Sequence, residues 1–207
     1  MQTMEMEIRS FQEQPTATAE SRRIEGYALV WGVRSRVIRD RGQRFVEIIE
    51  KGAITEELLQ RSDVKCVFNH DPEALLARYN RGEGTLKLTI DEVGLRYSFD
   101  APNTVDGDKV LELVRRGDLG GSSFKFATNG DKGVRYYREN GELMRSVDEI
   151  ARLADVSPVI DPAYVQTSVE ARSWGADEPE AEKPIEAKEN QGMTASAAVY
   201  HRLKLGL

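Results

Sequence analysis

The sequence predicts a mainly β, or α+β, fold in which an antiparallel β-barrel core is surrounded by a few helices. Short segments that alternate apolar and polar residues recur along the chain, and turns rich in glycine, asparagine and aspartate separate them. Strand-like and helix-like segments do not alternate regularly, as they would in a parallel sheet. We therefore expect about seven or eight strands with two or three helices.

The first elements follow a polar N-terminal stretch. The strands expected in this half of the core span residues 24–31, 44–49 and 64–68. A turn is expected over 39–43, and a helix over 53–61, where Ile54, Leu58 and Leu59 recur at helical spacing. Two alternating segments, 85–90 and 95–100, flank the turn residues 91–94 and so predict a hairpin.

The second half begins with a helix over residues 104–116. Thr104 can cap this helix, acidic residues fall in its first turn, and Gly117 ends it. A glycine-rich segment then leads into a strand over 120–126. Asn140-Gly141 predicts a hairpin of strands 134–138 and 143–147, and extended structure follows over 149–160, with Pro158 at an edge or bulge.

Composition divides the chain into three parts. Residues 1–22 are polar and lack periodicity, which predicts a flexible arm. Residues 23–173 carry the core pattern and form the expected domain. Residues 174–207 are rich in charge and cannot build a core, which predicts a disordered tail with a weak amphipathic helix over 195–205.

The bulk composition excludes several classes of function. The net charge is -6, which argues against a nucleic-acid partner. No apolar run is long enough to span a bilayer, and residues 1–23 lack the apolar region of a secretory signal. The chain has one cysteine, Cys66, so no intramolecular disulfide can form. Together these features predict an intracellular protein without a membrane partner.

Two segments carry candidate catalytic residues. His70 follows an apolar strand and is the one histidine of the predicted core, since His201 lies in the tail. Ser123 follows Gly120-Gly121-Ser122, where glycines permit close backbone approach and could leave N–H groups for an oxyanion. Serine needs a base to act as a nucleophile, and His70 suits that role. Asp155, in an apolar strand, could orient the imidazole.

Each candidate also has a simpler interpretation. A lone core histidine is more often structural, the Gly-Gly-Ser-Ser segment could be a loop, and Asp155 could pair with Arg152. Cys66 reads as a core residue because its neighbours are apolar. No cluster of cysteine and histidine indicates zinc, and no phosphate-binding loop is present, so we expect neither a metal nor a cofactor.

A set of short motifs resembles the prohead maturation proteases of tailed bacteriophages. No single motif is decisive, but their order and spacing over residues 24–172 are specific. They read Glu25-Gly26-Tyr27-Ala28, Trp31-Gly32, Glu50-Lys51-Gly52-Ala53, Phe68-Asn69-His70-Asp71, Gly117-Asp118-Leu119-Gly120-Gly121-Ser122-Ser123-Phe124-Lys125-Phe126, Asp155-Val156-Ser157-Pro158-Val159 and Pro162-Ala163-Tyr164.

This resemblance implies a fold similar to the herpesvirus assemblin proteases, with His70 as base and Ser123, rather than Ser122, as nucleophile. The family acid maps onto Asp155 but is usually glutamate, so Glu149 and Asp148 stay open as alternatives. Lys125 stands where the family commonly has glycine.

The resemblance also implies a serine endopeptidase that acts in the host cytoplasm, inside the assembling procapsid. Its partners would be the major capsid protein and the scaffold, and it would cleave segments of both. The resemblance also implies that the chain cleaves itself and that it self-associates as a dimer. The alternatives are a non-catalytic capsid-assembly or scaffold protein on the same barrel, and an esterase or amidase for small substrates.

Overall fold

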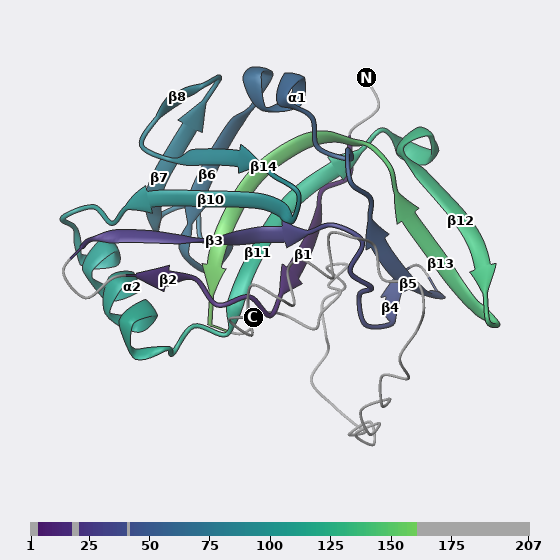
Figure 1. Cartoon of the computed structure of the whole chain (residues 1–207), viewed down its shortest axis with the longest axis horizontal. Helices are drawn as coiled ribbons and strands as arrows, with labels where there is room; N and C mark the ends of the chain where they lie inside the picture. Colours follow the sequence, from purple (N-terminus) through teal and green to yellow (C-terminus); the bar gives the residue numbers. More distant parts are fainter. Residues whose placement is uncertain (1–3, 18–20, 41, 161–207) are drawn as a thin grey trace.

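The computed structural model describes residues 4–17, 21–40 and 42–160 as three β-sheets with two α-helices and two short 3-10 turns. This confirms the mainly β class. The first sheet has six strands in the order β1 (Glu7–Phe11), β11 (Gly121–Thr128), β14 (Ile150–Val159), β6 (Asp63–Val67), β7 (Leu75–Asn80) and β8 (Glu83–Gly84). Figure 1 shows the long, curved β14 beside β11 in this sheet.

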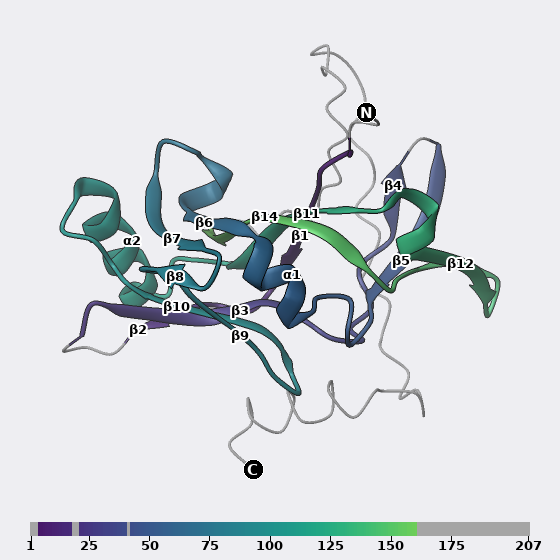
Figure 2. The ribbon, with the colours of Figure 1, turned by 90° about the horizontal axis from the view of Figure 1, so that it is seen from above.

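The other two sheets have four strands each. One has the order β2 (Thr16–Ala17), β3 (Arg23–Val30), β10 (Gly94–Asp100) and β9 (Lys87–Ile90). The other has the order β12 (Val134–Glu139), β13 (Glu142–Val147), β5 (Gln43–Ile49) and β4 (Ile38–Asp40). Figures 1 and 2 show the β12–β13–β5–β4 sheet at the opposite end of the molecule from helix α2 (Val105–Arg116).

Each helix begins after a threonine that caps its first turn, and for α2 this is the predicted Thr104. In α2, the Thr104 hydroxyl accepts a hydrogen bond from the Gly107 N–H at 3.1 Å, and Gly117 ends the helix with φ 73°. Helix α1 (Glu56–Arg61) begins later than the predicted residue 53, because Thr55 is its cap and accepts from the Leu58 N–H at 3.1 Å. Among the described residues, neither helix has the length and apolar character that crossing a membrane would require.

Part of the segment predicted to be a flexible arm forms strands instead. β1 pairs antiparallel with β11, and β2 pairs antiparallel with β3. Charged side chains are no obstacle in β1, because Arg9 binds Glu47 of β5 with 2.5 Å between Nε and Oε1. The predicted tail over 174–207, with its helix over 195–205, lies outside the described residues.

Two pairings in the described sheets are parallel, unlike the antiparallel pattern that the sequence predicts. β13 pairs parallel with β5, and β14 pairs parallel with β6. In each case the partners lie about a hundred residues apart in the chain, so local periodicity carries no information about their relative direction. Strands β4, β7 and β8 were also not predicted, and β4 includes part of the expected turn over 39–43.

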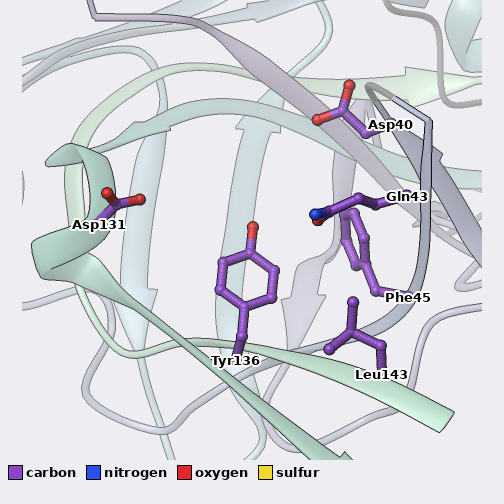
Figure 3. Close-up of a pocket in the computed structure, with 6 residues that line it drawn as sticks. All are labelled: Asp40, Gln43, Phe45, Asp131, Tyr136 and Leu143. Atoms are coloured by element: carbon purple, nitrogen blue, oxygen red, sulfur yellow. The ribbon is translucent and has the colours of Figure 1, made fainter.

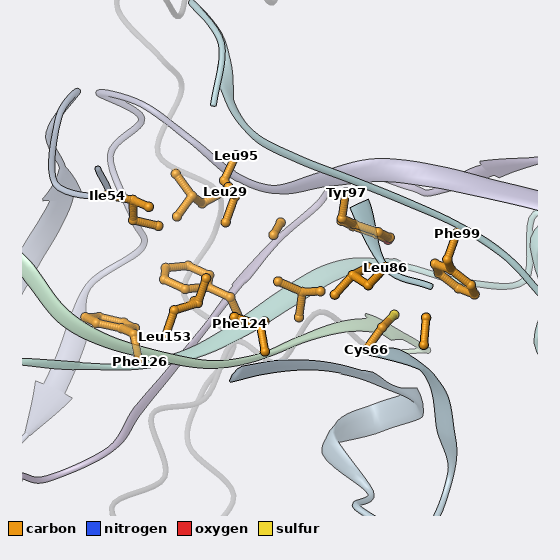
Figure 4. Packing of buried hydrophobic residues seen from close by; sticks show 14 of the residues in the cluster. Leu29, Ile54, Cys66, Leu86, Leu95, Tyr97, Phe99, Phe124, Phe126 and Leu153 are labelled. Atoms are coloured by element: carbon orange, nitrogen blue, oxygen red, sulfur yellow. The ribbon is translucent and has the colours of Figure 1, made fainter. Parts of the chain in front are cut away.

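The hydrophobic core lies between the six-stranded sheet and the β3–β10 pair. Leu29 of β3 and Leu95 and Tyr97 of β10 face Phe124 and Phe126 of β11 (Figure 4), and all five are fully buried. The rings of Phe124 and Phe126 stack with their centroids 4.9 Å apart. This packing fixes one face of β11 in the core and leaves its other face for polar side chains.

We expect Leu95→Ala to lower the free energy of unfolding by about 2–5 kcal/mol, because it removes a fully buried side chain from a packed core. Leu75→Ala is the matched control: Leu75 is 46% exposed, and we expect a change below about 1 kcal/mol. Urea denaturation of both variants measures the difference. Equal losses would show that the core is not where the structure places it.

Candidate active site

The pairing of β11 with β14 places three polar side chains on one face of the sheet. Ser123 of β11 lies directly opposite Ser157 of β14. Side chains of directly opposed residues share a face, as do residues two apart in one strand, so Asp155 lies on this face as well. The neighbouring pair, Phe124 and Val156, points into the core, where both are fully buried.

His70 reaches this face from the turn that follows β6. β6 runs parallel to β14, with Lys65 opposite Asp155, so its end lies alongside the end of β14. The turn η1 (Phe68–His70) holds Asn69 at φ 51° and His70 at φ 60°. This left-handed conformation costs free energy for residues other than glycine. The Asn69 side-chain oxygen accepts a hydrogen bond from the Ile160 N–H at 3.0 Å, which ties the turn to the end of β14.

The imidazole of His70 bridges Ser123 and Asp155. His70 Nδ1 lies 2.7 Å from Asp155 Oδ1, and His70 Nε2 lies 2.6 Å from Ser123 Oγ. The His70 and Asp155 side chains are 17% and 12% exposed. With the Nδ1 proton donated to the carboxylate, Nε2 is free to accept the hydroxyl proton of Ser123. The structure thus brings together the three residues that the sequence singled out.

Ser157 is a fourth member of this group that sequence reasoning missed. Its hydroxyl donates to Asp155 Oδ1 at 3.1 Å and lies 3.2 Å from His70 Nδ1. It is fully buried, so these contacts fix the carboxylate beside the imidazole. The spacing Asp155-Val156-Ser157 within a strand was the available signal, because residues two apart share a face.

The two alternative acids, Asp148 and Glu149, lie away from the His70 imidazole. The Asp148 carboxylate binds Arg135, at 2.5 and 2.8 Å, and this contact holds the pKa of Asp148 below its ordinary value. Glu149 is exposed. Asp155 binds His70 and Ser157, and so does not need the alternative partner Arg152.

Ser122 and Gly120 also differ in role from Ser123. The Ser122 hydroxyl faces the core side of β11, where it lies 2.9 Å from the Tyr97 hydroxyl and donates to the Glu13 carbonyl at 3.2 Å. The Gly120 N–H donates to the carbonyls of Val159 and Ile160, at 3.1 and 2.8 Å. The expectation that this glycine leaves its N–H free for an oxyanion was therefore wrong for Gly120 in this structure.

Two residues of β1 contact the Ser123 hydroxyl, and no local pattern in the sequence indicated either contact. Ser123 Oγ lies 2.8 Å from the Arg9 carbonyl oxygen, to which it can donate, and the Ser10 hydroxyl donates to Ser123 Oγ at 3.0 Å. These contacts follow from the register, in which Ser10 lies opposite Ser123. Ser123 is consequently 0% exposed.

A separate pocket of about 420 Å³ lies on the β12–β13–β5–β4 sheet and contains none of these residues. Figure 3 shows its lining side chains, which are Asp40, Gln43, Phe45, Asp131, Tyr136 and Leu143. Among the described residues, no group of three or more histidine, cysteine or acidic side chains is arranged to hold a metal ion.

Comparison with known proteins identifies one family. The family model described as the caudovirus prohead serine protease matches residues 5–180, which is most of the chain and includes β1. No curated protein and no solved structure matches the chain.

We expect Cys66 to resist alkylation in the folded chain. Burial, with a further effect of the Asp155 charge, raises the pKa of its thiol well above the ordinary value, so the thiol stays protonated near pH 8. Incubation with iodoacetamide, followed by mass spectrometry, should show modification in urea and almost none without it. Rapid alkylation of the folded chain would contradict the placement of Cys66 in the core.

Proposed function

We propose a catalytic mechanism and a substrate for this chain, which belongs to the caudovirus prohead serine protease family and is therefore a peptide hydrolase that acts in phage head maturation. The observation that carries the mechanism is the hydrogen-bonded chain from Ser123 through His70 to Asp155. A nucleophile, a base within reach of its proton and a carboxylate that orients the base are the groups that acyl transfer requires.

In the proposed reaction, Ser123 Oγ attacks the carbonyl carbon of the scissile peptide bond while His70 Nε2 takes the hydroxyl proton. His70 then gives that proton to the leaving amine nitrogen as the C–N bond breaks, which leaves an acyl ester on Ser123. His70 Nε2 then takes a proton from water as the water oxygen attacks the ester carbon, and gives it to Ser123 Oγ as the ester C–O bond breaks, which releases the new carboxyl end. Asp155 accepts from His70 Nδ1–H throughout and stabilises the imidazolium, and Ser157 holds the carboxylate in place.

We further propose that the three sheets correspond to a mainly antiparallel barrel like that of the herpesvirus assemblin proteases. The resemblance of the ordered motifs supports this, as does the mainly β class. The proposed catalytic domain spans residues 23–173, completed by the strands that residues 1–22 contribute, and is followed by a charged tail over 174–207.

The proposed substrates are segments of the scaffold and the major capsid protein, and the chain's own tail. Family membership supports procapsid components as the substrate class. The proposed place of action is the interior of the assembling procapsid in the host cytoplasm, and the proposed enzyme is a dimer.

We expect Ser123→Ala and His70→Ala each to reduce cleavage at least about 10⁴-fold, since either change removes a group that the chemistry needs. Ser122→Ala is the matched control, because it removes the neighbouring hydroxyl, which faces Tyr97. It should retain most of the activity. Cleavage of co-expressed capsid protein, followed by gel and mass spectrometry, measures all three. Loss of activity in Ser122→Ala alone would place the nucleophile one residue earlier.

We expect Asp155→Asn to lower the rate about 10²–10⁴-fold, because an amide cannot stabilise the imidazolium and favours the wrong tautomer of His70. Ser157→Ala should cost less, since it removes one support of the carboxylate rather than the carboxylate itself. Rate constants for cleavage of one capsid segment by the two variants test this order. Full activity in Asp155→Asn would exclude it as the orienting acid.

The substrate proposal is tested by co-expression with the cognate capsid and scaffold proteins and mass-spectrometric mapping of new termini. We expect new termini in these partners, and a shortened tail, with the wild type and not with Ser123→Ala. If the tail is intact in both, the chain does not process itself. If the partners are also intact, the proposed substrates are wrong.

A further inference from the structure

β1 lies on the edge of the six-stranded sheet that is nearest to the nucleophile. It pairs antiparallel with β11 over five residues, from Glu7 opposite Phe126 to Phe11 opposite Ser122. Within the described sheets β1 forms a ladder with β11 alone, because it is the terminal strand of the order β1–β11–β14–β6–β7–β8. Its removal would expose the edge of β11 without separating the remaining strands.

β1 blocks the attack that the proposed mechanism requires. A substrate carbonyl carbon must come within about 3–3.5 Å of the nucleophilic oxygen. The space beside Ser123 Oγ is filled by the Arg9 carbonyl at 2.8 Å and the Ser10 hydroxyl at 3.0 Å, and Ser123 has no exposed surface. No substrate can therefore reach Ser123 while β1 is in place.

β1 also competes with the base for the proton of the nucleophile. A serine hydroxyl has one proton to donate. It has two acceptors here, His70 Nε2 at 2.6 Å and the Arg9 carbonyl oxygen at 2.8 Å. The hydroxyl thus contacts a backbone carbonyl of an extended strand, which is the group that a peptide substrate would present to it.

A small, charged cluster holds β1 in this position. Arg9 binds Glu47 at 2.5 Å and Glu7 at 2.6 Å, and Glu7 binds Arg145 through both carboxylate oxygens at 2.8 Å. Glu47 and Arg145 also bind each other, and both are buried. Burial alone would lower the pKa of Arg9, but Glu47 and Glu7 outweigh it and raise that pKa, so Arg9 stays charged.

This cluster determines which charged residues a strand needs in order to bind at the edge of β11. When β1 leaves, Glu47 and Arg145 keep each other as partners and face the vacated edge. A strand that replaces β1 with a basic residue at the position of Arg9 and an acidic residue at that of Glu7 would restore the same ion pairs. The Phe126 ring, 5.7 Å from the Arg9 guanidinium, adds a surface for a cation.

We propose that the edge of β11 is the binding site for the substrate polypeptide, and that β1 occupies this site as an intramolecular inhibitor until it is displaced. The substrate adds to β11 as an antiparallel strand that carries an acidic and a basic residue two positions apart. This deepens the proposed function and rests on it. Strand addition supplies main-chain hydrogen bonds for affinity, and side-chain sites supply specificity.

A reversible cross-link between β1 and β11 tests the proposal in the full chain. Ile8 and Lys125 are directly opposite, and opposed antiparallel residues have Cα atoms about 4.5–5.5 Å apart, within reach of a disulfide. In Ile8→Cys/Lys125→Cys, oxidation should slow labelling of Ser123 by a fluorophosphonate at least about tenfold, and reduction should reverse this. The control is Arg138→Cys/Leu143→Cys, because these two residues are opposed in the β12–β13 hairpin. In this variant Ser123 should be labelled at the same rate in the oxidised and the reduced form.

The second test removes β1. In a chain without residues 1–11, the fluorophosphonate should label Ser123 faster than in the full chain. Addition of a peptide of residues 4–11 should slow this labelling again. The same peptide with Glu7 and Arg9 exchanged keeps the composition and places like charges opposite Arg145 and Glu47, so it should not compete.

Equal labelling of the oxidised and reduced β1–β11 cross-link variant overturns the inference and leaves the proposed function standing. Equal inhibition by the two peptides overturns the assigned charge pattern. A chain that neither labels nor cleaves procapsid proteins, both with residues 1–11 and without them, overturns the proposed function, and the inference with it.

Discussion

The antiparallel register between β11 and β14 is the constraint on which the candidate site depends. Because Ser123 lies opposite Ser157, strand alternation sends Phe124 and Val156 into the core and places Asp155 on the polar face with Ser123. A shift by one residue would bury the polar set and expose the apolar one. The core packing that stabilises the sheet therefore also fixes Ser123 and Asp155, the proposed nucleophile and acid, in position.

The same sheet connects the proposed catalytic residues with access to Ser123. Glu47 and Arg145 come from β5 and β13 and bind each other, and β1 adds Glu7 and Arg9 to this pair. Hydrogen bonds between charged groups are stronger than those between neutral groups. The contacts that Arg9 and Glu7 form therefore favour β1 at the edge of β11, and an incoming strand gains the same contacts only by bringing matching charges.

Features with a local signal could be predicted from the sequence. Asn140-Gly141 indicated the β12–β13 hairpin, Thr104 and Gly117 indicated the ends of α2, and the order of the motifs singled out His70 and Ser123. The rest depended on contacts between distant residues. The strand character of β1 comes from pairing with β11 and from Glu47, and the parallel pairing of β6 with β14 leaves no trace in local periodicity.

In the proposed mechanism, His70 and Asp155 act as one unit on Ser123. A double-mutant cycle of His70→Ala and Asp155→Asn on the rate of capsid-segment cleavage tests it most directly. If the acid works through the imidazole, the double variant will be no slower than His70→Ala alone. If the two losses multiply, Asp155 acts independently of His70, and the two residues do not form one catalytic unit.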